Sequence, residues 1–358
     1  MRRHYIDNLR TLAVLMLFVY HTAMMFNCFE SFYIYVRPVD ALNRFILFAW
    51  PFYMPLLFVL AGMSGAYALT KRTAKEYIKE RVNKLFIPLI AGVLLLVPMQ
   101  TYFAGRYHNG YSGGYLAQYI LFFTKPTDLT GYHGRFTPGQ LWFVLYLFVI
   151  SLLALPLMLW YNKRGTPIDA NKLTLPVILP MFLIPLVMAL ILNIGGKSVG
   201  EYFAYFMLGY FVLSRDEVIE RLRTHRWPLL GSAILLLCVL VYICETRGFS
   251  LVTDILTRAA GWVSVLAMLG SAKQWFDFTN RALIYLAGAS FAVYVFHQSW
   301  LVAAAYYVCK VTDNTLLIFV LTIAISVVLT FASYEVARRF RITRWLFGIS
   351  AKSLRKTS

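Results

Sequence analysis

Charged side chains are scarce in this chain of 358 residues. Asp, Glu, Lys and Arg together make up 14% of it, against about a quarter of a soluble globular protein, whereas 60% of its residues are hydrophobic. This scarcity argues against a water-soluble globular protein. Apolar runs of about 18 residues recur along the chain, and each is long enough to cross a hydrocarbon core of about 30 Å as a helix. We therefore expect an all-α, polytopic integral membrane protein.

Cysteine is scarce too, and the spacing of Cys28, Cys238, Cys244 and Cys309 fits no metal site. Cys28 and Cys309 fall near the outer membrane face in the topology derived below and could pair there, but we expect free thiols packed among apolar side chains. The chain also lacks a small-x-small cleavage site after its first apolar run, so this run is expected to remain as a span. No period of about 20–50 residues repeats, which disfavours the commonest transporter architectures.

Ten apolar segments are expected to cross the bilayer. The long connection 105–139 holds a further apolar stretch, Tyr115–Phe123, which is too short to cross and is expected to form an interfacial or re-entrant helix. Residues 1–348 are predicted to form a single membrane-embedded domain, and 349–358 a short basic cytoplasmic tail. The predicted spans are 9–26, 45–69, 85–104, 140–160, 174–193, 199–213, 227–244, 252–270, 283–308 and 315–337.

Basic residues are distributed unevenly between the two sides that these spans define. With ten spans both termini share a side, and the connections on that side hold 25 of the 34 lysines and arginines, against eight on the other. The positive-inside rule then places both termini in the cytoplasm, in a plasma or inner membrane. Because the net charge of +18 resides in these loops, we expect no nucleic-acid partner.

The few ionisable residues within spans are the first candidates for a functional site, because a charge at membrane depth costs about 2.5–3.5 kcal/mol on insertion. The main ones are His21, Glu201, Arg258, His297 and Glu335. His297 is expected at almost the same depth as His21, so the two could share a cavity. The alternative is that each is a core histidine bonded to a neighbouring helix. Glu335 is expected to be a structural partner for nearby arginines.

Arg10 opens the first span, eleven residues before His21. At about 1.5 Å and 100° per residue, this spacing separates the two by roughly 16–17 Å on one helical face. Arg10 would then lie at the cytoplasmic mouth and His21 near mid-membrane. Alternatively, Arg10 is only an interfacial anchor. Asp7, three residues earlier, is placed to pair with the Arg10 guanidinium or to cap the helix.

Four short motifs follow one another along the chain: Tyr5-Ile6-Asp7-Asn8-Leu9-Arg10 with His21, Leu141-Trp142-Phe143-Val144, Ser290-Phe291-Ala292-Val293-Tyr294-Val295-Phe296-His297, and Phe347-Gly348. In this order they resemble the motifs of the acyltransferase family 3 membrane proteins. Thr11 departs from that pattern, since glycine commonly follows the arginine there. Lys84 departs from it too, because the basic pair Arg81-x-x-Lys84 often ends in arginine in the family, and lysine cannot bind phosphate in a bidentate manner.

The resemblance implies an enzyme that takes an acyl group, most often acetyl, from cytoplasmic acyl-CoA to a hydroxyl of a cell-envelope glycan, an antibiotic or a lipid. It implies acyl-CoA as co-substrate, no permanently bound cofactor or metal, and a glycan or lipid-linked acceptor. His21 would act as general base or carry the acyl group briefly. Arg10, Arg81 and Lys84 would bind the phosphates of the donor, with His297 also on the donor side.

Five residues fall on the outer, acceptor side in this topology: His133, Arg135, Trp142, Glu201 and Arg258. An aromatic ring with polar groups nearby suits a sugar, although Trp142 is also what an interfacial aromatic belt would supply. The alternative from another functional class is a proton-coupled transporter or flippase, in which intramembrane histidines relay protons or bind the cargo.

Overall fold

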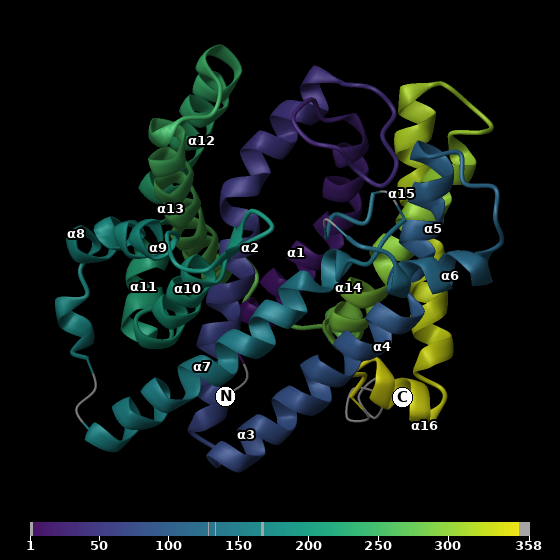
Figure 1. The fold of residues 1–358 in the computed structure, drawn as a ribbon. Helices are drawn as coiled ribbons and strands as arrows, with labels where there is room; N and C mark the ends of the chain where they lie inside the picture. The colour runs from purple at the N-terminus through teal and green to yellow at the C-terminus, as the bar shows by residue number, and fades with distance from the viewer. Residues whose placement is uncertain (1–2, 128, 133, 166–167, 351–358) are drawn as a thin grey trace. The chain divides into compact units, whose positions relative to one another are not determined.

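The computed structural model describes residues 3–350 except 128, 133, 166 and 167, and helices dominate these residues (Figure 1). Within this described part, eight helical segments are long and apolar enough to cross a membrane. The prediction of an all-α, polytopic membrane protein is thereby confirmed. The eight segments are His4–Phe26, Asp40–Leu69, Ala74–His108, Gly139–Arg164, Arg226–Arg247, Leu251–Trp275, Arg281–Val308 and Thr315–Ala337.

Prolines divide the third segment into shorter helices, because proline has no backbone N–H to donate to the preceding turn. Pro88 and Pro98 stand in the first turns of α4 and α5, where the missing donor costs least. The elements of the first three segments are α1 (His4–Ala23), η1 (Met24–Phe26), α2 (Asp40–Leu69), α3 (Ala74–Arg81), the π-helical η2 (Val82–Phe86), α4 (Ile87–Leu95) and α5 (Val97–His108).

The connection that follows α5 contains α6 (Tyr115–Thr124), ten residues long. It is too short to cross a membrane, as predicted for this stretch. Apart from the elements between η4 and α11, which are described next, the elements after it are η3 (Gly139–Leu141), α7 (Trp142–Arg164), η4 (Ala170–Lys172), α11 (Asp216–Thr224), α12 (Arg226–Arg247), α13 (Leu251–Trp275), α14 (Arg281–Val308), α15 (Thr315–Ala337) and α16 (Arg341–Leu346).

Two of the ten predicted spans do not form a helix long enough to cross a membrane. Residues 174–193 divide into α8 (Leu175–Ile178), η5 (Leu179–Phe182) and α9 (Leu183–Met188), because prolines recur at positions 176, 180 and 185. Residues 199–213 form α10 (Val199–Phe211), whose 13 residues reach only about 20 Å. A short hairpin, β1 (Asn193–Ile194) with β2 (Lys197–Ser198), joins them. Both segments lie between the same two long helices. Removing the two from the ten predicted spans leaves an even number, so the predicted topology still has both termini on one side.

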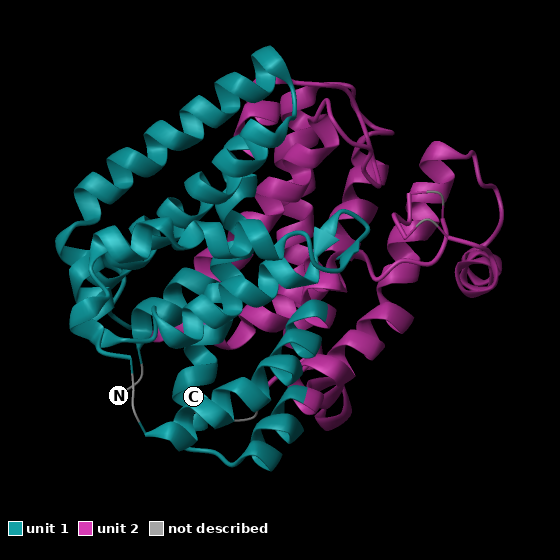
Figure 2. Cartoon of the chain, turned by 60° about the vertical axis from the view of Figure 1, so that its left-hand side comes forward, with its two compact units in different colours: residues 1–10, 47–81, 146–280 teal, residues 11–46, 82–145, 281–358 magenta. Residues whose placement is uncertain are grey.

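The chain forms two compact units (Figure 2). Unit 1 comprises residues 1–10, 47–81 and 146–280, and unit 2 comprises residues 11–46, 82–145 and 281–358. In unit 1, α2 and α10 approach backbone to backbone. A Cβ on Gly62 would collide with the Phe206 carbonyl, and a Cβ on Gly209 would collide with the Val59 carbonyl. Small residues allow this approach where helices pack in lipid.

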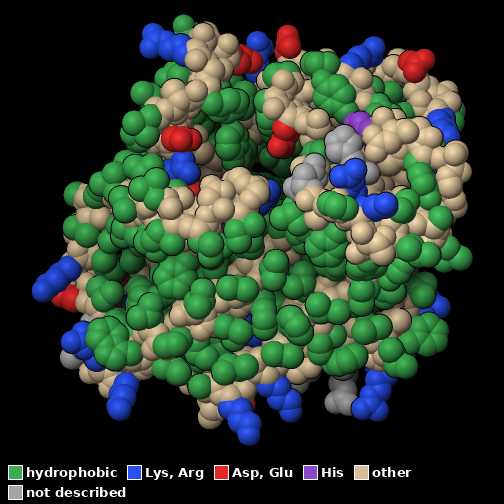
Figure 3. Space-filling model, viewed as in Figure 1, with side chains coloured by type: hydrophobic (Ala, Val, Ile, Leu, Met, Phe, Trp, Pro, Cys, Tyr) green, Lys and Arg blue, Asp and Glu red, His purple; other side chains and the backbone are tan. Residues whose placement is uncertain are grey.

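Helix α15 of unit 2 buries one stripe and exposes the rest of its surface. Its contact with α14 includes a hydrogen bond from the Trp300 indole Nε1 to Ser333 Oγ at 2.8 Å. Its large exposed side chains are aliphatic, among them Leu316, Val320, Val328 and Val336, and hydrophobic side chains predominate on the molecular face shown in Figure 3. This pattern suits a helix that faces lipid. The buried stripe is Ile318, Thr322, Ser326, Thr330, Tyr334 and Ala337.

Candidate functional site

Arg10 is held by two side chains of unit 1. Its NH1 lies 3.3 Å from Asp7 Oδ1, and its NH2 donates to Ser64 Oγ of α2 at 2.7 Å. The predicted pairing with Asp7 is therefore confirmed. The Arg10 side chain remains 34% exposed, so the guanidinium is oriented and still accessible to a ligand.

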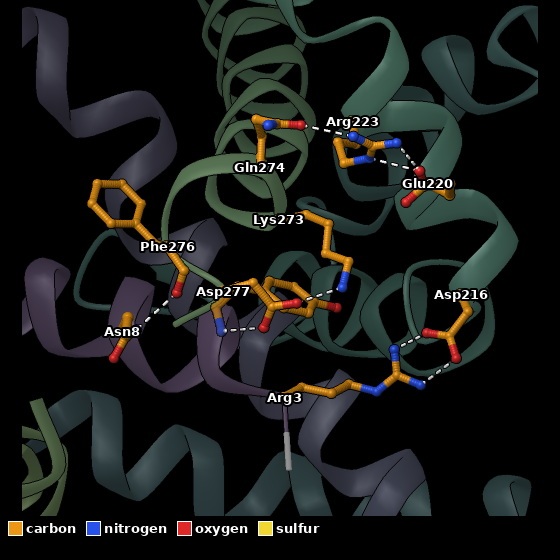
Figure 4. Close-up of polar contacts among 10 residues, drawn as sticks. Arg3, Asn8, Asp216, Glu220, Arg223, Lys273, Gln274, Phe276 and Asp277 are labelled. Atoms are coloured by element: carbon orange, nitrogen blue, oxygen red, sulfur yellow. Dashed lines mark hydrogen bonds and ion pairs between the residues drawn. The ribbon is translucent and has the colours of Figure 1, made fainter. Parts of the chain in front are cut away.

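The first turns of α1 are tied to the end of α13 and to α11 (Figure 4). Asn8 Nδ2 donates to the carbonyl oxygens of Phe276 and Phe278, each at 2.8 Å. The Tyr5 backbone N–H donates to Asp277 Oδ1 at 3.3 Å, and Arg3 forms an ion pair with Asp216 of α11. These contacts fix the helical turn from which Arg10 projects.

His21 and His297 lie together in unit 2. Their ring centroids are 5.4 Å apart with 30° between the ring planes. Phe32 stacks on His21 at 5.9 Å, and Phe18 meets His297 edge to face at 5.7 Å. His297 is fully buried, whereas His21 keeps part of its surface accessible. The two rings thus lie close together, as the equal predicted depth of the two residues allows.

A carbonyl group determines which nitrogen of neutral His297 carries the proton. The ring Nδ1 lies 2.7 Å from the Tyr294 carbonyl oxygen, which can only accept a hydrogen bond, so Nδ1 is the donor. His297 Nε2 is then the acceptor, and it is buried without a hydrogen-bond partner among the described residues. His21 Nδ1 is buried and unpartnered in the same sense. The pair therefore offers hydrogen-bonding capacity to a reactant.

An uncharged polar network, which sequence reasoning missed, lies beside His297. Gln100 Nε2 donates to Gln140 Oε1 at 2.9 Å and to Ser299 Oγ at 2.8 Å. Gln140 Nε2 donates to the Val295 carbonyl oxygen at 3.0 Å. Ionisable side chains are not the only ones that are costly to bury in an apolar span. Glutamine within an apolar run is costly for the same reason, and this signal would have found Gln100 and Gln140.

The predicted acceptor-side residues are divided between the units. In unit 1, Glu201 Oε2 pairs with Arg258 NH2 at 3.0 Å, and each side chain is 17% exposed. Arg258 NH1 also lies 3.5 Å from Asp254 Oδ1. In unit 2, Arg135 is exposed and Trp142, at the start of α7, is partly buried. His133 lies outside the described residues.

The predicted donor-side cations stand at and after the end of α3. The Arg81 guanidinium lies 4.5 Å above the ring centroid of Tyr77, and its Nε is buried without a partner in the described part of the chain. Lys84 is exposed on the π-helical turn η2. A guanidinium oriented on an aromatic face still presents its remaining N–H groups to an anion.

Two further sequence predictions can be compared with the structure. Glu335 pairs with Arg338 at 2.8 Å and accepts a hydrogen bond from the Tyr285 hydroxyl at 2.7 Å, which confirms its structural role. All four cysteines are free thiols. Among the described residues, no three metal-ligating side chains lie close enough to hold an ion.

Comparison with known proteins gives a family and a set of curated relatives. The family model described as an acyltransferase domain matches residues 3–335. Proteins named "Glucans biosynthesis protein C" from Salmonella schwarzengrund, Salmonella paratyphi B and Salmonella enteritidis are each 22% identical over 380 residues, covering 97% of this chain and 94% of the relative. No solved structure matches the chain.

Proposed function

The chain belongs to acyltransferase family 3, and from this premise we propose that it moves an acyl group, acetyl in the first instance, from cytoplasmic acyl-CoA to a hydroxyl of a cell-envelope glycan. The relatives' name concerns glucan biosynthesis, which supports a glucan as the acceptor. The proposed location is the plasma or inner membrane with both termini in the cytoplasm, which rests on the distribution of basic residues.

The observation that carries the proposal is the pair of histidines 5.4 Å apart in unit 2, one of them partly accessible. A neutral His21 imidazole takes the proton from the acceptor hydroxyl as its oxygen attacks the thioester carbonyl. The new C–O bond forms, the C–S bond breaks, and the imidazolium returns the proton to the departing thiolate. Atoms and charge balance without any further reactant.

The donor is proposed to bind through cations. Its phosphates would receive charge-assisted hydrogen bonds from Arg10, Arg81 and Lys84. Arg10 supports this role because Asp7 and Ser64 orient it while it stays partly exposed. His297 Nε2 can only accept in its present tautomer, so an amide N–H of the pantetheine arm is a suitable partner.

The acceptor is proposed to approach from the outer side of the membrane, because the topology predicted from the basic residues assigns Arg135, Trp142, Glu201 and Arg258 to that side, with His133 as a further candidate. The Glu201 and Arg258 pair can both accept from and donate to sugar hydroxyls. Trp142 offers an aromatic face on which a sugar ring packs.

A transfer assay separates this proposal from the transporter alternative. The purified protein in lipid nanodiscs is incubated with acetyl-CoA labelled in the acetyl group and with glucan oligosaccharides. We expect label on the glycan, and no label with His21→Ala. If the wild-type protein consumes no acyl-CoA, yet dissipates a proton gradient in vesicles when a glycan is supplied, it is a transporter and the proposal is wrong.

A further inference from the structure

Three polar side chains from separate elements of unit 2 form one buried chain of hydrogen bonds. Gln100 comes from α5, Gln140 from η3 and Ser299 from α14, and their residues are exposed by 0%, 5% and 0%. Ser299 Oγ donates onward to the Leu96 carbonyl oxygen at 3.0 Å. Each amide in the chain has a defined orientation, because its N–H groups meet only acceptors.

Gln140 is the member of this network that reaches the helical turn before His297. Its side-chain Nε2 donates to the carbonyl oxygen of Val295 at 3.0 Å. Its own backbone carbonyl accepts a hydrogen bond from the Tyr294 hydroxyl. One residue thus holds the two residues Tyr294 and Val295 by separate contacts.

Tyr294 in turn determines which ring nitrogen of His297 carries the proton. Its carbonyl oxygen accepts a hydrogen bond from His297 Nδ1, and its ring centroid lies 5.7 Å from that of His297. A shift of this turn would move the acceptor away from Nδ1. The imidazole would then be free to rotate or to exchange its proton between the two nitrogens.

We propose that Gln140 is a positioning residue that holds His297 with Nδ1 protonated and Nε2 available as an acceptor beside His21. The catalytic part of this inference rests on the function proposed above. Within the described residues, Gln100 Oε1 is left without a hydrogen-bond partner, but most donors of the network are paired, so an alternative geometry would leave further polar groups unsatisfied. Misplacing a reacting group by about 1 Å can cost roughly 100-fold in rate.

The experiment combines a spectroscopic and a kinetic measurement on Gln140→Leu in nanodiscs. Histidine labelled with ¹⁵N in the ring reports which nitrogen is protonated, and His297→Ala identifies the His297 signal. We expect wild-type His297 to show a protonated Nδ1 alone and Gln140→Leu to show a mixture of both forms. Single-turnover acyl transfer should fall about 10- to 100-fold, while the acyl-CoA dissociation constant stays within about twofold.

Gln118→Leu is the matched control, because Gln118 is 3% exposed and its Nε2 donates to the Gly134 carbonyl oxygen rather than to a member of the Gln100, Gln140 and Ser299 network. It should change neither the ¹⁵N spectrum of His297 nor the transfer rate. Tyr294→Phe removes only the hydroxyl that binds Gln140, and it serves if Gln140→Leu does not fold. It too should yield both forms of His297.

The inference is overturned if folded Gln140→Leu or Tyr294→Phe keeps the wild-type ¹⁵N spectrum, or if Gln118→Leu alters it equally. The spectrum needs no acyl donor, so it tests the positioning of His297 separately from the function. If Gln140→Leu changes the His297 spectrum but the wild-type protein transfers no acyl group, the positioning is upheld and the acyltransferase proposal is refuted. A slower Gln140→Leu with an unchanged spectrum would refute the positioning alone.

Discussion

Replacing His21 and Arg10 by alanine should impair the protein in two different ways, although both residues project from α1. His21→Ala is expected to abolish turnover and leave acyl-CoA binding nearly intact, because the imidazole acts in the chemical step. Arg10→Ala is expected chiefly to raise the acyl-CoA concentration required for half-maximal activity. It removes a contact that the enzyme makes equally with the bound donor and with the transition state.

The size of each effect follows from the surroundings of the two side chains. Loss of a general base typically lowers the rate about 10²–10⁴-fold, which corresponds to about 2.7–5.5 kcal/mol of activation free energy. Arg10 is 34% exposed and Asp7 23% exposed, and a pair this accessible contributes at most about 1 kcal/mol to folding. Arg10→Ala should therefore fold, and its defect should reflect donor binding.

His21→Ala also removes a ring that stacks on Phe32 and His297. Because His21 is partly accessible, the cost to folding should lie below the about 3–5 kcal/mol found for a fully buried large ring. His21→Phe is the control, since it keeps an aromatic ring in the stack and removes both nitrogens. It should be as inactive as His21→Ala and more stable.

The assay measures equilibrium binding of acyl-CoA and single-turnover transfer for each variant, after gel filtration and thermal unfolding show a folded protein. Normal turnover by His21→Phe would refute the role of the imidazole. Equal loss of binding and turnover in both alanine variants would show that the two residues serve only the structure.

Three further predictions concern charge, topology and thiol reactivity. Arg81→Ala should weaken acyl-CoA binding more than Arg81→Lys, and the difference from wild type should narrow at high salt, because screening weakens the phosphate contact in the wild-type protein; titrations at two ionic strengths test this. In a Cys28→Ser background, an impermeant maleimide added to intact cells should label Asn109→Cys and leave Lys71→Cys unlabelled. The reverse pattern would show that the topology is opposite to the one predicted. Burial raises the pKa of the Cys309 thiol to about 11, so its thiolate is rare at pH 8 and alkylation should accelerate about tenfold per pH unit up to that value. The exposed Cys28 should react much faster at pH 8, and mass spectrometry of a time course measures both.

The long helices and the main site residues could be predicted because their signals are local. Apolar runs of sufficient length gave eight of the spans, and the spacing of three residues from Asp7 to Arg10 gave their ion pair. The equal depth of His21 and His297 followed from counting residues along two helices that run in the same direction. Their 5.4 Å separation did not follow, since it depends on how α1 and α14 pack.

The predictions that failed have two causes, one local and one that depends on the fold. Residues 174–193 are apolar enough to resemble a span, but the recurring prolines interrupt the backbone hydrogen bonds that a crossing helix needs. Ser64, the partner of Arg10, and Gln140, the neighbour of Tyr294, are uncharged and lie far away in sequence. No periodicity along one segment reveals such a partner, because the contact arises only on folding.

The contrast between α14 and α15 bears on how the protein is made. Among the eight long helices, α14, which carries His297 and Ser299, has the lowest mean hydropathy and α15 the highest. The insertion machinery should accept α15 readily from its own composition and α14 only with difficulty. The indole of Trp300 and the hydroxyl of Ser333 then join them. A chain truncated before α15 should therefore leave α14 poorly retained in the bilayer and open to quality-control proteolysis.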